Sequence, residues 1–110
     1  MNELENRIYL LVECVVDCCV VDAEGGKITR EEILSKSKKE NVMIARYMLA
    51  YHLLDLGLSY TTISQFFGCT IQSARNMIAN HYKWLRGSVA YQIANKQVES
   101  KKLERKIKEI

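Results

Sequence analysis

The chain contains no proline and only five glycines among its 110 residues. Folds rich in β-structure use both residue types to reverse the chain at tight turns, so their scarcity argues against such a fold. With 48% apolar and 26% charged residues, the composition is ordinary for a folded protein. At this length the chain can form one domain with a modest core. We therefore expect a compact all-α domain.

Sequence patterns of catalysis are also missing. The chain has no GxxxxGK[ST] loop for a nucleotide and no paired-carboxylate, nucleophile or metal-ligand arrangement at the required spacing. His52 has only Asp55 near it on its own helix, so we expect a packed or surface imidazole and no catalytic base. His81 is expected to end a helix, where a cation suits the helix dipole. We expect no enzymatic activity, cofactor, bound metal or small-molecule substrate.

The four cysteines are Cys14, Cys18, Cys19 and Cys69. Three of them crowd onto one apolar run, and free cysteine packs as a small hydrophobe. We therefore expect buried thiols in a reducing cytoplasm. Cys14 and Cys18 lie four residues apart and share a helix face, which leaves a soft-metal or redox role as the alternative.

Signals for a membrane are absent as well. The apolar run at residues 8–21 is interrupted by Glu13 and Asp17 and is too short to span a bilayer. The first residues, MNELENR, lack the basic region of a signal peptide. We expect a cytoplasmic protein without a membrane partner.

The net charge of +3 is small, but it is unevenly distributed. Residues 1–26 carry one arginine against six acids, whereas residues 27–86 carry nine lysines and arginines against four acids. The last 24 residues are again basic, with six against three. A basic middle segment favours an anionic partner such as nucleic acid.

Residues 58–82, LSYTTISQFFGCTIQSARNMIANHY, predict two short helices joined by a turn at Gly68. Ser59 and Thr70 stand where N-cap hydroxyls would accept from first-turn N–H groups. Gly68 falls where a left-handed backbone often ends a helix. Ser64 and Ala74 are small residues where the two helices would approach. This layout predicts a helix-turn-helix.

The second of these helices has two different faces. Its inward face is predicted to hold Ala74, Met77, Ile78 and Tyr82, and its outward face Ile71, Gln72, Ser73, Arg75, Asn76 and Ala79. Gln and Asn side chains pair with adenine edges in the major groove, and Arg pairs with guanine. The alternative is an ordinary helical hairpin whose polar face meets water.

The flanking segments also predict helices. Residues 3–21 form a deeply buried helix ended by AEGGK, and residues 30–34 a short helix that Thr29 and Glu32 cap reciprocally. A polar run at 35–41 precedes a long helix over 42–56, which Gly57 ends. The last helix begins at Val89, and its expected apolar line is Val89, Ile93, Val98 and Leu103 or Ile107. We expect a domain over 1–86 and a C-terminal helix over 87–110, packed at its start and frayed at its end.

The order of these segments resembles the C-terminal DNA-binding domain of the bacterial replication initiator DnaA. The segments ILSKSKK (33–39), ARYMLAYHL (45–53), LSYTTI (58–63) and FFG (66–68) are similar to the family's LLSKSRK, ARQIAMYL and LSLPEIGRLFG. The likeness covers roughly residues 8–85. It implies a helix-turn-helix fold of the Trp-repressor and DnaA C-terminal kind, with an extra C-terminal helix, in a bacterial or phage protein.

By this resemblance Lys36, Lys38, Lys39 and Arg46 would lie on the DNA backbone or minor groove, and the helix after Thr70 would enter the major groove. The family's sequence after the glycine resembles GRDHTTVLHA, whereas this chain has CTIQSARNM at 69–77. The Asp-His pair is absent, so the family's base contacts are not carried over.

These observations together predict a protein that binds double-stranded DNA. The expected base contacts are Ile71, Gln72, Ser73, Arg75 and Asn76, and the expected backbone contacts are Lys36, Lys38, Lys39, Arg46, Ser59 and Thr70. The function would be regulation of replication initiation or of transcription, with a second copy or a replication or transcription protein as a further partner. The alternative is a protein-interaction module that kept the scaffold and lost DNA reading.

Overall fold

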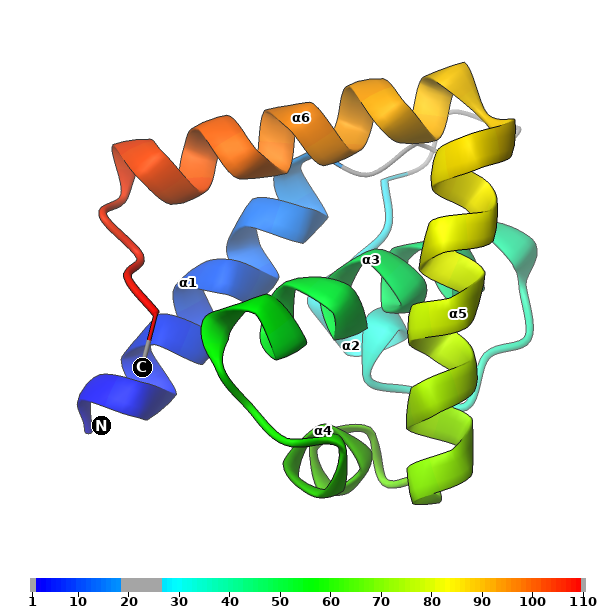
Figure 1. Ribbon diagram of the computed structural model, residues 1–110, viewed down its shortest axis with the longest axis horizontal. Coiled ribbons are helices and arrows are strands. Elements are labelled where there is room, and N and C mark those ends of the chain that lie inside the picture. Colours follow the sequence, from blue (N-terminus) through cyan, green and yellow to red (C-terminus); the bar gives the residue numbers. More distant parts are fainter. Residues whose placement is uncertain (1, 19–26, 110) are drawn as a thin grey trace.

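The computed structural model describes residues 2–18 and 27–109, which form six helices and no strand (Figure 1). The helices are α1 (Glu3–Cys18), α2 (Arg30–Ile33), α3 (Glu40–Leu56), α4 (Tyr60–Phe67), α5 (Ile71–Gly87) and α6 (Val89–Glu104). The expected all-α fold is confirmed. None of these helices is both long and apolar enough to cross a membrane.

Helix α3 lies at the centre of the molecule. Its buried residues are Val42, Ala45, Met48, Leu49, Ala50, His52, Leu53 and Leu56. They fall on several sides of the helix, and a helix that is apolar all round must be covered on all sides. Helices α1, α2, α4 and α5 all contact α3. The core therefore forms around this helix, with α1 contributing Leu11, Val12 and Val15.

Helices α5 and α6 complete the covering of the core. Helix α5 runs from α4 at one end of the molecule to α6 at the other (Figure 1), and α6 packs against α1 and α5. Ala74 and Ile78 of α5 are buried, as predicted. Because α5 reaches both ends of the molecule, it connects α4 and the turn that follows it to α6.

The apolar line predicted for the last helix is largely wrong. Val89, Ile93 and Leu103 are exposed, by 70%, 53% and 81%. Val98 is buried as predicted, and the other buried residues of the helix are Tyr91, Ala94 and Lys102, which share one face with it at helical spacing. The helix ends at Glu104, and beyond it Ile107 packs against the core. In the second half of α6, Val98 and Lys102 are buried, whereas Gln97, Ser100, Leu103 and Glu104 are exposed.

Other helix boundaries lie close to those predicted. The reciprocal cap of Thr29 and Glu32 on α2 is present, and Gly57 ends α3 in the left-handed conformation. Helix α3 begins two residues earlier than expected, at Glu40, because Lys39 already has the extended backbone of an N-cap. The expected end of the first helix at residue 21, most of the AEGGK break and Cys19 lie outside the described residues.

The expected place of His81 is also wrong. Helix α5 continues to Gly87, so His81 lies within it and is fully buried, whereas Tyr82, expected inside, is 44% exposed. The ring of His81 stacks on Tyr51 with centroids 4.1 Å apart, and its Nδ1 lies 2.6 Å from the hydroxyl oxygen of Tyr91. Its buried Nε2 has no hydrogen-bond partner among the described residues. Burial lowers the pKa of His81 to about 4, because the charged form of the ring loses its hydration in the core.

His52 joins α3 to α6 through a buried polar cluster. The ammonium of Lys102 lies 3.2 Å from His52 Nδ1 and 2.9 Å from a carboxylate oxygen of Asp55. Because an ammonium group can only donate, Nδ1 accepts, and the proton of the neutral ring is on Nε2, which donates to Asn95 Oδ1 at 2.8 Å. Burial, and then the charge of Lys102, lower the pKa of His52 to about 3. Of the two alternatives expected for His52, a packed or a surface imidazole, the structure has the packed one.

The two buried histidines predict a loss of stability in acid. Both have a lowered pKa in the folded chain, so between pH 6.5 and about 4 the unfolded chain binds more protons than the folded one. The free energy of unfolding should therefore fall as the pH drops through this range, by about 1.4 kcal/mol per pH unit for each histidine.

Urea denaturation at pH 7, 6, 5 and 4.5 measures this loss. The variant His81→Phe keeps a ring to stack on Tyr51 and cannot titrate. It should be less stable than the native chain at pH 7 yet show a shallower dependence on pH. Equal pH dependence in both proteins would contradict the assignment to His81.

Candidate nucleic-acid interface

Helices α4 and α5 form the predicted helix-turn-helix. The hydroxyl of Ser59 accepts from Thr62 N at 3.1 Å and that of Thr70 accepts from Ser73 N at 3.0 Å, so each caps its helix. Gly68 between them has φ +66°, in the left-handed region. Its N–H donates to Gln65 O. All three local predictions are confirmed, and they fix where α5 begins.

The small residues predicted between the helices are buried. Ser64 is 4% exposed and Ala74 is fully buried, in agreement with a close approach of α4 and α5. The hydroxyl of Ser64 donates to Thr61 O at 2.7 Å, so this buried polar group is paired.

The outward face of α5 carries the predicted base-reading side chains. Gln72, Arg75 and Asn76 are exposed, Ile71 is 42% exposed, and Ser73 is half-buried. The amide of Gln72 donates to Asn76 Oδ1 at 3.0 Å. This contact does not use Gln72 Oε1 or the Asn76 NH₂ group, so these can bind other partners. Ser73 is engaged by Thr70, whose hydroxyl donates to Ser73 Oγ. The face therefore presents donors and acceptors beside one apolar side chain.

Arg75 has a neighbour that the sequence did not reveal. Its guanidinium lies over the ring of Tyr60, 5.3 Å from the centroid. Such a cation–π contact limits the orientations of the arginine without using its N–H donors. Tyr60 is the first residue of α4, fifteen positions earlier in the chain, and no local pattern links the two residues.

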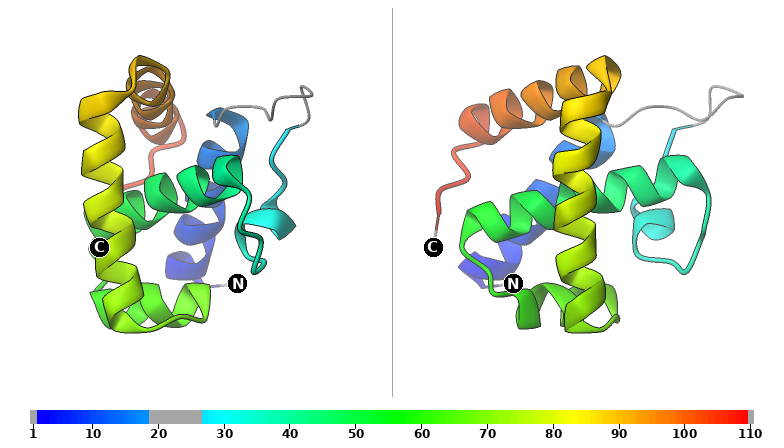
Figure 2. Two further views of the ribbon diagram at one scale, coloured as in Figure 1. Left: turned by 90° about the vertical axis from the view of Figure 1, so that its right-hand side faces the viewer. Right: turned by 45° about the vertical axis from the view of Figure 1, so that its right-hand side comes forward.

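The polar run before α3 lies beside the turn of the helix-turn-helix. Figure 2 shows this segment as the loop between α2 and α3, which dips toward the end of the molecule that holds α4. Lys36 Nζ donates to the carbonyl of Gly68 at 3.0 Å, and Lys38 and Lys39 are exposed. The structure thus brings Lys36 to the turn that precedes Thr70 and the start of α5, and Lys38 and Lys39 are exposed on the same segment.

Arg46 occupies a different position. It is half-buried on α3, and its guanidinium is directed to backbone carbonyls of the segment between α2 and α3. Burial lowers its pKa, although an arginine remains charged in proteins.

His52, Asp55 and Glu99 are the acid and histidine groups of the described residues that come close enough together to suggest a metal site. The ammonium of Lys102 lies among them, 2.9 Å from Asp55 Oδ2 and 3.8 Å from Glu99 Oε2. This lysine supplies the positive charge that a metal ion would bring, so the cluster fits an internal ion-pair network better than a metal site.

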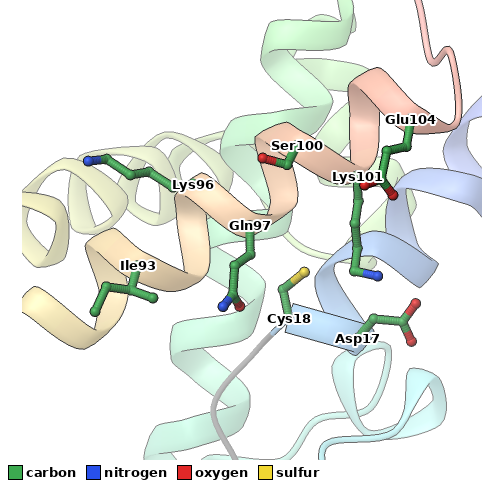
Figure 3. Close-up of a pocket in the computed structure, with 8 residues that line it drawn as sticks. All are labelled: Asp17, Cys18, Ile93, Lys96, Gln97, Ser100, Lys101 and Glu104. Atoms are coloured by element: carbon green, nitrogen blue, oxygen red, sulfur yellow. The ribbon is translucent and has the colours of Figure 1, made fainter.

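A shallow depression lies between the end of α1 and α6 (Figure 3). It is lined by Asp17, Cys18, Ile93, Lys96, Gln97, Ser100, Lys101 and Glu104. Cys14 and Cys18 are free and buried, and burial raises the pKa of both thiols. A thiol with a raised pKa is a poor nucleophile. Among the residues that line it, the depression combines opposite charges without a catalytic arrangement.

Comparison of the chain with protein-family models, with curated proteins and with solved structures gives no match. The resemblance to the DnaA domain therefore rests on the residues quoted above, and the assignment of function rests on the geometry of this surface.

The turn supplies a test of the helix-turn-helix geometry. Gly68→Ala places a side chain on a left-handed residue and should lower the free energy of unfolding by about 1–2 kcal/mol. Gly87→Ala is the matched control, since a Cβ there meets nothing within 4 Å. Helical alanine is favoured over glycine, so this variant should be neutral or more stable by up to about 1 kcal/mol. Urea denaturation measures both, and equal effects would contradict the special role of Gly68.

Proposed function

We propose that this protein is a DnaA-C-terminal-like DNA-binding protein without catalytic activity, which reads double-stranded DNA through α5. The observation that carries the proposal is the joint position of two groups of residues. The exposed Gln72, Arg75 and Asn76 lie on α5, and Lys36 of the lysine segment contacts Gly68 in the turn before α5.

The two groups suit the two parts of DNA recognition. Amide and guanidinium side chains contact base edges, and lysines contact phosphates and set the register of the protein on the duplex. Gln72 and Asn76 would contact adenine, Arg75 guanine, and Ile71 a thymine methyl group. Ser73 would be a further base contact. Lys36, Lys38 and Lys39, with the hydroxyls of Ser59 and Thr70, would contact the backbone.

The biological role that follows is control of replication initiation or of transcription in the cytoplasm of a bacterium or a phage-infected cell. The Asp-His pair of the DnaA signature is absent from the start of α5, so the target would differ from a DnaA box.

A second candidate function is supported by a different observation. Val89, Ile93 and Leu103 of α6 are large apolar side chains in contact with solvent, and the first 26 residues carry a net charge of −5. A protein-interaction module that kept this scaffold would use such surfaces, and it would not need the exposed polar face of α5.

Fluorescence anisotropy with a randomised duplex pool and a DnaA-box duplex, at about 50 and 200 mM salt, separates the two functions. Six phosphate contacts would weaken binding about a thousandfold over that range. Salt-sensitive binding without preference for the DnaA box would support the proposal and lead to selection of the true site. Absence of binding at low salt would favour the protein-interaction module.

Two single variants then test the division between base and phosphate contacts. Arg75→Ala should weaken binding to the selected site by about 1–3 kcal/mol and relax the preference at one base pair. Lys38→Ala should weaken binding to all sequences to a similar extent. Equal losses for Arg75→Ala on selected and scrambled duplexes would exclude this residue as a base contact.

A further inference from the structure

Arg46 makes more hydrogen bonds to the backbone than any other side chain described here. Its Nε donates to Ile33 O at 2.8 Å and its Nη1 donates to Ser37 O at 2.7 Å. Its Nη2 donates to Glu32 O at 3.3 Å and to Ser35 O. A guanidinium has five N–H donors, so four are directed at carbonyls of a segment only six residues long.

The acceptors explain why this segment needs Arg46. Glu32 and Ile33 are the last residues of α2, a helix of only four residues. The carbonyl of Glu32 also accepts from the N–H and the hydroxyl of Ser35, whereas the carbonyl of Ile33 accepts from Arg46. Ser35 and Ser37 belong to the polar connection that follows. A positive group at these carbonyls also suits the negative end of a helix. Arg46 therefore joins the end of α2 and the connection to α3.

The same contacts orient the lysines. With the carbonyls turned toward Arg46, Lys36, Lys38 and Lys39 remain exposed, and Lys36 extends to Gly68 O. Serine hydroxyls brace the backbone further: Ser35 Oγ accepts from Ser37 N, and Ser37 Oγ accepts from Lys39 N. The lysine segment is thus held in one shape from inside.

We propose that Arg46 is a positioning residue for DNA binding: it makes no contact with DNA and holds the segment at 35–39 so that its three lysines meet phosphates together. This inference rests on the proposed function and assigns Arg46 a role different from the backbone contact that the resemblance implies. To reach a phosphate, the guanidinium would have to leave the carbonyls that it now satisfies.

The charge-preserving variant Arg46→Lys distinguishes the two roles. A lysine keeps the positive charge but lacks the planar fork that meets several carbonyls at once. If Arg46 contacts a phosphate directly, Arg46→Lys should leave the dependence of affinity on salt almost unchanged. If Arg46 positions the segment, the slope of log affinity against log salt should become shallower by about 2, because several phosphate contacts weaken together.

Lys38→Ala is the matched control, and its slope should change by about 0.9, as for one phosphate contact. In the Arg46→Lys background, Lys38→Ala should add little further, since coupled residues are not additive. Amide hydrogen exchange without DNA should become faster at residues 35–39 in Arg46→Lys and stay unchanged in the buried part of α3. This result would show that the variant remains folded.

Each contrary result has a separate meaning. If the native chain binds duplex DNA and Arg46→Lys leaves the slope of log affinity against log salt unchanged, the positioning role alone is overturned. This holds whether or not hydrogen exchange at 35–39 becomes faster. Native chain that does not bind duplex DNA at about 50 mM salt would overturn the proposed function and this inference with it.

Discussion

The structure depends on the burial of α3. This helix has apolar residues on several sides, so it is stable in water only when other helices cover it. Helices α1, α4 and α5 all pack against α3, so the burial of α3 sets how these helices are arranged around it. The start of α5, where the side chains proposed to read bases lie, is therefore supported by a packed core, and a rigid support would suit a surface that matches the fixed spacing of base edges.

The proposed DNA surface combines contacts of short and long range. The caps at Ser59 and Thr70 and the left-handed Gly68 set the path of the chain through the turn. Lys36 then connects that turn to the segment before α3, and Tyr60 orients Arg75. The two caps and Gly68 shape the helix-turn-helix, and Lys36, which is distant in sequence, adds positive charge that would contact phosphates.

The features that the sequence predicted well are local. A cap or a left-handed glycine is specified by residues within four positions, so Thr29, Ser59, Gly68 and Thr70 could be assigned from the chain alone. The inward face of α6 could not, because this helix buries Lys102 and exposes Leu103, and two partners of that lysine, His52 and Asp55, lie on α3. The contacts of Arg46 were hidden for a similar reason, since carbonyl acceptors have no signature in the side-chain pattern.

The buried cluster around Lys102 also bears on how this sequence can change over time. Removing the lysine would leave Asp55 and Glu99, which are partly exposed, without their shared cation. It would also leave Nδ1 of the fully buried His52 without a donor, and an unpaired buried polar group is costly. Neutral drift at one of these positions is therefore restricted unless the others change with it. Homologous chains should show covariation between residues 52, 55, 99 and 102, because these residues form the polar contact between α3 and α6.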